Sequence, residues 1–371
     1  MSEPLRELIT EALRGASAYH VPQPPRVVAK LDANELPYAL PAEVATALAA
    51  ELATVPLERY PAADAGVLRP AVARHLGVDP ASLVFGNGSD ELIAMLCAGF
   101  AAPRPGAARA GVLYPWPSFV YYRIAAMVAG RDAIEVPLRD DFTLDADEVA
   151  RVVATRRPNL AFFALPNNPT GTLWSVDAVL ALAKAHPDVI VVSDEAYLAY
   201  GGRTLLPELA TTPNLVVMRT LSKVGLAGLR CGFLIASPLV VETLEKVRPP
   251  YNLNSLTQRA AAWLLDHHAD AMATHAAAVV AERARLAAGL AALPGVRVYP
   301  SEANLLMIRL GNPGDGRAAA IWAALADRGI MVRNFDAPGA RGPLAGCLRV
   351  TVGTPAEDDL LVAALRELLA A

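Results

Sequence analysis

Three polar segments of the sequence hold residues that could carry chemistry. The first is 167–171 (Asn-Asn-Pro-Thr-Gly), the second is 194–197 (Asp-Glu-Ala-Tyr), and the third is 222–230, which begins with Ser-Lys and ends in Arg. Each of them follows a short apolar run that reads as a buried strand. In an open α/β sheet, ligands bind outside the carboxyl ends of the strands. We therefore expect the three segments to meet at one edge of a sheet.

Each segment has a chemical interpretation and a plainer one. Lys223 is flanked by Ser222 and by small or apolar residues, with Arg230 nearby. A lysine amine in apolar, cationic surroundings is readily deprotonated and can form a Schiff base. Taken singly, a strand-end lysine is most often solvated, Asp194 fits a helix N-cap, and Asn-Pro-x-Gly is a common turn. The order and spacing of all three segments are far more specific.

The chain from about 80 to 240 alternates short apolar runs with helical patterns, which predicts the sheet that positions these segments. Several runs are apolar throughout, which is typical of strands covered by helices on both faces. We predict an α/β fold with a large domain built on a mostly parallel mixed sheet flanked by helices, and a smaller α+β domain. The predicted strands are 82–85, 111–114, 133–136, 160–164, 189–193, 215–218 and 231–235, and the predicted helices are 90–101, 118–128, 145–155 and 175–186.

The two ends of the chain complete this organisation. Residues 4–14 fit an amphipathic helix that leads into a Pro-rich arm, and residues 255–292 fit one or two long helices. Thr354 and Glu357 form a capping box at the start of a last helix. We expect an N-terminal helix and arm (1–30), a large domain (31–270, of which 31–55 could join the small domain) and a small domain (271–371). In the last of these, strands are predicted at 296–299, 304–309, 330–333 and 347–352, with a helix at 317–328.

Composition excludes several classes of protein. The 371 residues are enough for two domains, and 54% apolar residues with a net charge of −4 exclude a mainly disordered chain. The balance of 33 basic against 37 acidic residues disfavours a nucleic-acid partner. No apolar run is suited to cross a membrane. Three widely spaced cysteines and an N-terminus without a signal-peptide pattern favour the cytoplasm. The histidines show no metal-ligand spacing, so no metal is expected.

Together, the three segments resemble the signature of the fold-type I, aspartate-aminotransferase-like enzymes, which use pyridoxal 5'-phosphate (PLP). The signature is Asn-Pro-x-Gly, then Asp-x-x-Tyr, then Ser-Lys with a following Arg, and the resemblance runs from Tyr19 to the last strand. It implies that Lys223 is the Schiff-base lysine and later the general base. It also implies that Asp194 keeps the pyridine nitrogen protonated, and that Asn168 and Tyr197 hydrogen-bond the ring hydroxyl.

The same resemblance implies a site for the cofactor phosphate. The segment Gly-Asn-Gly-Ser-Asp-Glu, which contains Ser89 and Asp90, lies between a predicted strand and a predicted helix. Backbone N–H groups and the helix dipole form an anion site at such a position. Ser89 and Asp90 would act mainly through backbone amides, and Ser222 and Arg230 would add side-chain bonds. Phe119 matches the aromatic position that stacks on the PLP ring, although alone it would be read as a core aromatic.

Within this family, the chain resembles the histidinol-phosphate aminotransferases. The element Asp-Ala-Asn-Glu-Leu-Pro contains Asn34, which we count among the substrate-binding residues. Tyr60, in Arg-Tyr-Pro, matches the tyrosine that reaches the PLP phosphate of the neighbouring subunit in a homodimer. Arg349 would bind the α-carboxylate of glutamate. Arg349 and Arg333, with Tyr19 from the arm, would hold the phosphate group of histidinol phosphate.

These resemblances predict a cytoplasmic homodimer that transfers an amino group between histidinol phosphate and 2-oxoglutarate in histidine biosynthesis. Aromatic amino acid aminotransferases share nearly the same scaffold, and the sequence departs from the histidinol-phosphate pattern at Leu36 and in using Phe119 in place of Tyr. A PLP-dependent threonine-phosphate decarboxylase has the same fold and phosphate-binding arginines. A regulator with an aminotransferase-like sensor domain is disfavoured, because the segment before Leu31 is too short for a helix-turn-helix.

Overall fold

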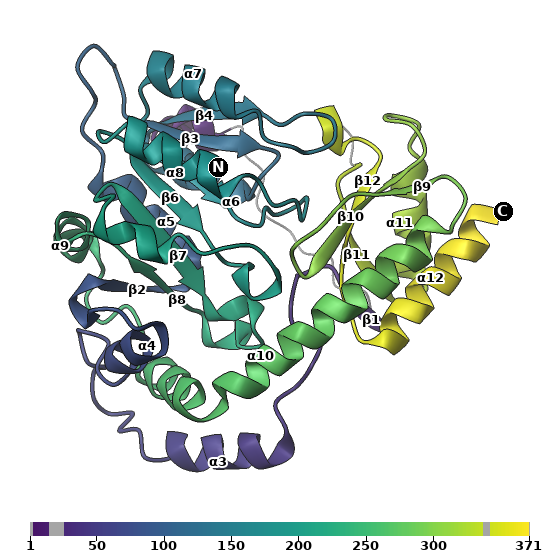
Figure 1. Cartoon of the computed structure of the whole chain (residues 1–371), viewed down its shortest axis with the longest axis horizontal. Coiled ribbons are helices and arrows are strands. Elements are labelled where there is room, and N and C mark those ends of the chain that lie inside the picture. Colours follow the sequence, from purple (N-terminus) through teal and green to yellow (C-terminus); the bar gives the residue numbers. More distant parts are fainter. Residues whose placement is uncertain (1–2, 15–25, 337–341, 371) are drawn as a thin grey trace.

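The computed structural model describes residues 3–14, 26–336 and 342–370, so Tyr19 lies outside the described residues. Its elements form two sheets that lie side by side, a seven-stranded one and a five-stranded one (Figure 1). The long helix α10 (Ser255–Ala291) runs past both of them. In the part of the chain that the structure describes, no helix is long and apolar enough to cross a membrane.

The larger sheet confirms the predicted mostly parallel mixed sheet. Five neighbouring strands, β7 to β4 in the sheet order, are parallel, while β8 runs antiparallel to both β7 and β2. The register sets Asp194 beside Ala164 on one side and Met218 on the other, so the ends of three strands meet at one edge. In sheet order the strands are β2 (Leu83–Asn87), β8 (Cys231–Ile235), β7 (Leu215–Thr220), β6 (Ile190–Asp194), β5 (Leu160–Ala164), β3 (Gly111–Trp116) and β4 (Asp132–Pro137).

Apolar side chains cover both faces of this sheet, which explains why its strands lack alternation. Phe162 packs in one cluster, with residues of α5 and α6, while its neighbour Phe163 packs in another, with residues of α7 and α8. Successive residues of a strand point to opposite faces, so a strand buried on both sides needs apolar residues throughout. The surrounding helices are α4 (Leu68–Leu76), α5 (Gly88–Gly99), α6 (Val120–Val128), α7 (Ala146–Arg156), α8 (Val176–Ala185) and α9 (Pro238–Val247).

The smaller sheet combines the C-terminal part of the chain with one strand from the N-terminal part. β1 pairs in parallel with β11, and the other neighbours are antiparallel. The predicted capping box is present at the start of the last helix, since the Thr354 N–H donates to Glu357 at 2.9 Å. The strands in sheet order are β1 (Ala29–Leu31), β11 (Ile330–Asn334), β12 (Cys347–Thr351), β10 (Leu305–Leu310) and β9 (Val296–Val298), with helices α11 (Arg317–Asp327) and α12 (Pro355–Ala370).

Several elements differ from the sequence prediction. The expected helix at 4–14 is divided into α1 (Glu3–Glu7) and α2 (Glu11–Arg14), and the carbonyl of Thr10 accepts the first hydrogen bonds of the second. A threonine favours helix starts over helix interiors. Four elements were not predicted from the sequence, namely β1, α3 (Ala42–Leu52), α4 and α9. β1 is only three residues long, which is too short to show a periodicity.

The long helix also bears on the expected domain division. α10 is a single helix of 37 residues that continues through positions 270 and 271 without a break, and its residues enter the apolar clusters of both sheets. β1, which begins before position 31, belongs to the smaller sheet. These features do not by themselves fix domain boundaries, and the division at 31 and 271 remains a prediction. Short 3₁₀ turns at 80–82, 198–200, 206–210, 221–223, 227–229 and 342–344 complete the chain.

Candidate active site

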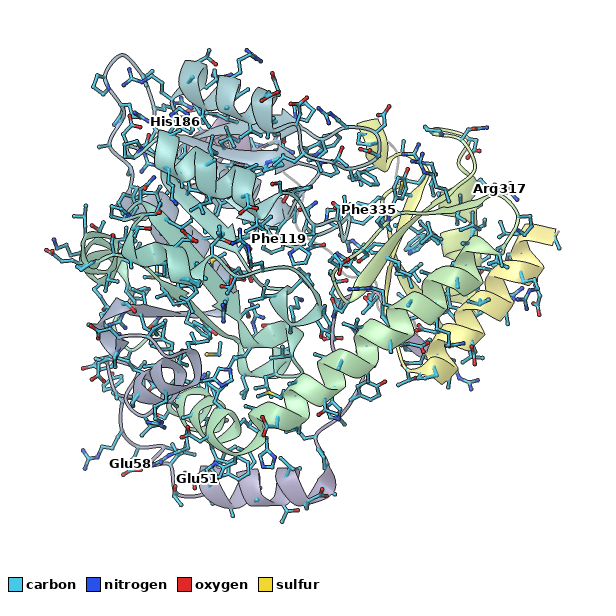
Figure 2. All side chains as sticks on the ribbon, in the orientation of Figure 1. Glu51, Glu58, Phe119, His186, Arg317 and Phe335 are labelled. Carbon is cyan, nitrogen blue, oxygen red and sulfur yellow. The ribbon has the colours of Figure 1, made fainter. Side chains whose placement is uncertain are left out.

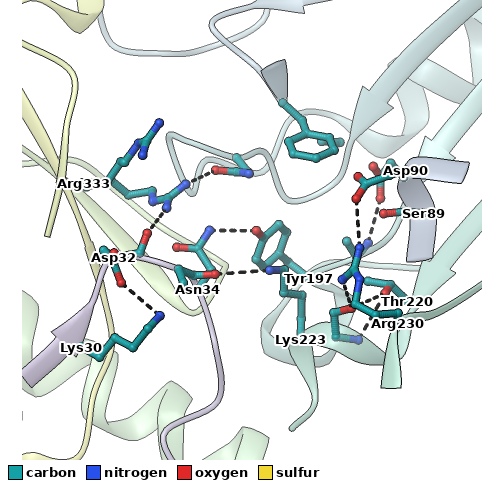
Figure 3. Close-up of a pocket in the computed structure, with 18 residues that line it drawn as sticks. Lys30, Asp32, Asn34, Ser89, Asp90, Tyr197, Thr220, Lys223, Arg230 and Arg333 are labelled. Atoms are coloured by element: carbon teal, nitrogen blue, oxygen red, sulfur yellow. Dashed lines mark hydrogen bonds and ion pairs between the residues drawn. The ribbon is translucent and has the colours of Figure 1, made fainter. Parts of the chain in front are cut away.

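A cavity of about 250 Å³ lies between the two sheets, and most of the residues predicted to carry chemistry line it (Figure 3). Phe119, from the side of the larger sheet, lies in Figure 2 where that sheet faces the smaller one. The lining also includes residues that the sequence analysis did not select, such as Lys30, Asp32 and Thr220. The predicted residues that meet there are Asn34, Ser89, Asp90, Phe119, Asn168, Asp194, Tyr197, Ser222, Lys223, Arg230, Arg333 and Arg349.

Lys223 enters the cavity from the end of β7. A 3₁₀ turn, Leu221–Lys223, follows that strand directly, and the Thr220 side chain accepts a hydrogen bond from the Ser222 N–H at 3.2 Å. The Lys223 amine donates to the Ala33 carbonyl at 3.4 Å and lies 5.8 Å from the ring centre of Tyr197. The turn thus delivers a primary amine into a cavity whose far wall comes from the other sheet.

Asp194 is the buried carboxyl of the site. Its Oδ2 accepts from the Tyr122 hydroxyl at 2.6 Å and its Oδ1 accepts from the Ala196 N–H at 3.1 Å. Burial raises the pKa of this carboxyl to about 6, against the lowering effect of those two hydrogen bonds. A buried carboxylate of this kind binds a cationic or protonated partner strongly, because such a partner replaces the lost water.

Tyr122 was not selected from the sequence, although its spacing from Phe119 indicates that it lies near the site. It follows Phe119 by three residues, which is about one helical turn, so both rings face the same side. The Tyr122 ring stacks on Phe162 with ring centres 4.8 Å apart and meets Phe119 edge-on at 5.6 Å. These contacts hold the hydroxyl against Asp194 and leave Phe119 at the cavity wall.

The residues predicted to bind the cofactor phosphate meet at the N-terminus of α5. The helix begins at Gly88, so the N–H groups of Ser89 and Asp90 lie in its first turn. Arg230 donates to Ser222 at 3.5 Å and to the carboxylate of Asp90 at 3.0 Å. Asp90 was expected to act through its backbone N–H, so the contact of its carboxylate with Arg230 is an additional feature of the structure.

Two glycines allow the close packing at this helix start. Gly88 has φ +78°, and a Cβ there would lie 2.7 Å from an Nη atom of Arg230. A Cβ on Gly232, in the neighbouring strand β8, would lie 2.6 Å from the backbone of Gly88. Both are far closer than side chains approach. The missing side chains let the helix start, β8 and the Arg230 guanidinium approach one another closely.

Arg333 and Arg349 lie opposite, on the smaller sheet. They are directly paired across β11 and β12, so both project from neighbouring positions. Arg349 donates to the Asn168 side-chain oxygen at 2.7 Å and to the Asp32 carbonyl at 2.5 Å. Asn168 therefore has its amide NH₂ left for another acceptor. At the same wall, Lys30 contacts Asp32 at 3.3 Å in an ion pair.

Asn34 is buried in the site, whereas Tyr60 is exposed and lies outside the cavity of its own chain. Asn34 is only 2% exposed and donates to the Tyr197 hydroxyl at 2.8 Å. Tyr60 is 81% exposed, stacks on Tyr251 with ring centres 4.8 Å apart, and is not among the residues that line the cavity of its own chain. The expected substrate contact of Asn34 and the expected contact of Tyr60 with a neighbouring subunit remain predictions.

Comparison with known proteins accounts for this arrangement. Residues 26–365 match the family described as aminotransferase class I and II. The chain belongs to this aminotransferase family. Histidinol-phosphate aminotransferase 1 of Burkholderia lata is 42% identical to it over 363 residues, which cover 97% of this chain and 98% of that protein. The histidinol-phosphate aminotransferase of Chromobacterium violaceum is 42% identical over 363 residues, with 98% of both chains covered.

A solved structure extends the similarity to three dimensions. The crystal structure of histidinol-phosphate aminotransferase from Sinorhizobium meliloti in complex with pyridoxal-5'-phosphate matches this aminotransferase with a TM-score of 0.85. The two sequences are 26% identical, and the match covers 98% of this chain and 97% of that one. Both sheets therefore belong to the shared fold, which confirms the predicted PLP fold type I.

Proposed function

We propose that this aminotransferase uses PLP to transfer an amino group between histidinol phosphate and 2-oxoglutarate, as a step of histidine biosynthesis. The observation that carries the proposal is one cavity in which a lysine, a buried carboxyl and an anion site face two arginines. The curated relatives named above, at 42% identity over nearly the full chain, bear the name of this activity.

The residues present fit PLP. The anion site at α5 offers backbone N–H groups and a guanidinium for a phosphate, and the glycine at position 88 keeps that space open. Asp194 is buried without a cationic partner among the described residues, which suits a protonated ring nitrogen. When bound, PLP supplies an electron-accepting ring that stabilises negative charge on the substrate's α-carbon.

The chain's own residues would supply attachment, orientation and proton transfer. Lys223 offers the amine that binds the cofactor covalently, and the same amine then moves a proton at the substrate's α-carbon as general base. Asp194 would keep a proton on the ring nitrogen, and Phe119 would pack against the ring. Asn168 and Tyr197 would donate hydrogen bonds to the ring hydroxyl. Each of these side chains lines the cavity.

The paired arginines would select the substrates. A guanidinium binds a carboxylate or a phosphate through two parallel hydrogen bonds. Arg349 suits the α-carboxylate of glutamate, because it is already held by Asn168 and the Asp32 carbonyl. Arg333, its cross-strand neighbour, adds the second cation that the phosphate of histidinol phosphate requires.

Absorption spectroscopy of single half-reactions tests the substrate. The purified protein is mixed with histidinol phosphate, phenylalanine and threonine phosphate in parallel, and conversion of bound PLP to its amine form is followed. We expect histidinol phosphate and glutamate to react. Equal reactivity of phenylalanine would favour an aromatic amino acid aminotransferase, and carbon dioxide release from threonine phosphate would favour a decarboxylase.

Removing Arg333 should impair only the phosphorylated substrate. We expect Arg333→Ala to lower kcat/KM for histidinol phosphate by about 10- to 100-fold, which corresponds to the loss of one charge-assisted contact. The value for glutamate should change much less. Arg317→Ala, which removes an exposed arginine at the start of α11, is the matched control. An equal loss of kcat/KM for both substrates would contradict the proposal that Arg333 binds the phosphate group of the substrate.

Adding a methyl group at the anion site should weaken cofactor binding. We expect Gly88→Ala to lower PLP affinity by about tenfold or more, because a positive φ costs roughly 1–2 kcal/mol for alanine and the new Cβ displaces Arg230. Dialysis followed by fluorescence titration with PLP measures the affinity. Gly77→Ala, at φ +67° with open space around it, controls for backbone strain. Equal PLP affinities of the two variants would contradict the proposed phosphate-binding site at the start of α5.

We also propose that the active form is a cytoplasmic homodimer. Tyr60 is exposed and outside its own cavity, which suits a contact with the phosphate in a partner's cavity. The three cysteines are free and buried, as suits a reducing compartment. Mixing Tyr60→Ala subunits with Lys223→Ala subunits tests the shared site. We expect each variant alone to be impaired and the mixture to regain activity, since a mixed dimer would hold one complete cavity.

A further inference from the structure

We propose that Asn34 is a positioning residue that directs the hydroxyl hydrogen of Tyr197 into the cavity, and that Thr351 fixes Asn34 for this purpose. The inference rests on the proposed PLP-dependent function. It deepens that function by assigning Asn34 to the cofactor side of the site instead of the substrate side.

Hydrogen bonds connect Thr351 to Tyr197 through Asn34. The backbone N–H of Asn34 donates to the Thr351 hydroxyl at 2.9 Å, and that hydroxyl donates to the Asn34 side-chain oxygen at 3.2 Å. The Asn34 amide nitrogen then donates to the Tyr197 hydroxyl at 2.8 Å. Asn304 donates to the Asn34 carbonyl at 3.1 Å. Asn34, Thr351 and Tyr197 are all buried, so each lost bond would leave a polar group unpaired.

The direction of these bonds follows from what each group can do. An amide oxygen only accepts and an amide nitrogen only donates, whereas a hydroxyl does both. With the Asn34 oxygen toward Thr351, the threonine hydrogen has an acceptor. With the amide reversed, that hydrogen would have no acceptor among the residues that the structure describes. The Thr351 hydroxyl therefore selects the orientation in which Asn34 presents its NH₂ group to Tyr197.

This orientation determines where the Tyr197 hydrogen goes. The tyrosine oxygen already accepts from Asn34, so its own hydrogen must point elsewhere, and the described residues offer it no acceptor. Tyr197 lines the cavity, and Asn34 approaches it from the side of the smaller sheet (Figure 3). The O–H is thus kept available for an oxygen of the bound cofactor. A reversed amide would instead attract that hydrogen to Asn34.

The same strand carries the substrate arginine and this device. Thr351 follows Arg349 by two residues on β12, so both side chains lie on one face of that strand. Arg349 orients Asn168 while Thr351 orients Tyr197 through Asn34. One strand of the smaller sheet therefore sets the hydrogen-bonding direction of both predicted partners of the cofactor hydroxyl.

A pH titration of the bound PLP absorbance tests the proposal without measuring turnover. The midpoint reports loss of the proton on the Lys223 nitrogen that is bonded to the cofactor. A hydrogen-bond donor at the cofactor's phenolic oxygen stabilises the negative charge on that oxygen, so the oxygen holds the proton on the lysine nitrogen less tightly. Loss of the donor therefore raises the midpoint. We expect Asn34→Asp to raise this midpoint by about one pH unit, because the introduced carboxylate accepts the tyrosine hydrogen. Asn34→Ala should raise it less, since the hydroxyl is then free to rotate.

Two comparisons separate this role from a general structural one. Tyr197→Phe should raise the midpoint, and adding Asn34→Ala to Tyr197→Phe should cause no further shift, because Asn34 acts only through the hydroxyl. Thr351→Val, which keeps the shape but removes the hydroxyl, should raise the midpoint. Thr351→Ser, which keeps the hydroxyl, should retain the wild-type midpoint.

Two results would overturn the proposal. One is a wild-type midpoint in all Asn34 variants together with a raised KM for glutamate, which would assign Asn34 to the substrate. The other is a full additional shift on the Tyr197→Phe background. If wild-type protein binds PLP but does not react with histidinol phosphate, the proposed substrate fails, while the midpoints of the variants still decide the role of Asn34.

Discussion

Lys223→Ala is expected to reduce transamination by about 10⁴-fold or more, with the fold intact. One general acid–base group contributes up to about 10⁴-fold, and Lys223 also provides the covalent attachment of the cofactor. Among the described residues, the Lys223 amine has no carboxylate partner; it donates a long bond to the Ala33 carbonyl and lies over the Tyr197 ring, so its removal leaves no buried charge unpaired. Steady-state rates with histidinol phosphate and the absorbance of bound PLP measure the two effects.

Two further lysine variants make this result specific. Lys223→Arg keeps a positive charge in the cavity but cannot form a Schiff base, so it should be as inactive as the alanine variant. Lys184→Ala removes a partly exposed lysine that pairs with Glu208 at 3.5 Å, and it should retain wild-type rates. Substantial activity of Lys223→Arg would mean that charge alone is required, and the assignment of Lys223 as the attachment point would then be wrong.

The strands of the larger sheet could be predicted from the sequence, because local pattern determines them. The seven strands of the larger sheet have short, mostly apolar runs, and all seven were found within a few residues of their bounds. β1 was missed because it is three residues long, and its pairing with β11 joins positions about 300 residues apart. No sequence period reports such a pairing, since it is set by tertiary packing. The sequence also left undecided whether residues 255–292 form one helix or two. They form the single helix α10, because an Ala-rich run has no internal stop signal.

In the candidate site too, residues at strand ends could be predicted, whereas contacts between residues far apart in the sequence could not. Lys223, Asp194 and Asn168 follow strands, so their convergence at one edge could be predicted from the strand order of parallel sheets. The partners that tune them could not. Tyr122 reaches Asp194 across 72 positions, and Asn34 reaches Tyr197 across 163. These contacts depend on how helices and the smaller sheet pack on the larger sheet, and a single sequence does not encode that packing in a readable pattern.

Asp194→Asn is expected to lower transamination by about 10³-fold and, at the same time, to stabilise the cofactor-free protein at neutral pH. The activity falls because a neutral amide no longer keeps the ring nitrogen protonated. The stability rises because a buried carboxylate that awaits a cation is costly. Burial raises the pKa of Asp194 from about 4 to about 6, which is worth up to about 3 kcal/mol, and loss of one accepted hydrogen bond offsets about 1 kcal/mol of that.

The pH dependence distinguishes this cause from a general packing effect. The folded protein binds the Asp194 proton more tightly than the unfolded chain does, so the wild-type protein loses stability as pH rises from about 4 to about 6. Asp194→Asn removes this loss. The two unfolding free energies, measured without PLP, should therefore diverge over that interval and stay apart at higher pH. Asp336→Asn, which alters a buried carboxyl bonded to the Gly346 N–H outside the cavity, should lower stability and leave activity nearly unchanged. A stability difference for Asp194→Asn that is constant from pH 4 to 8 would refute the argument from burial.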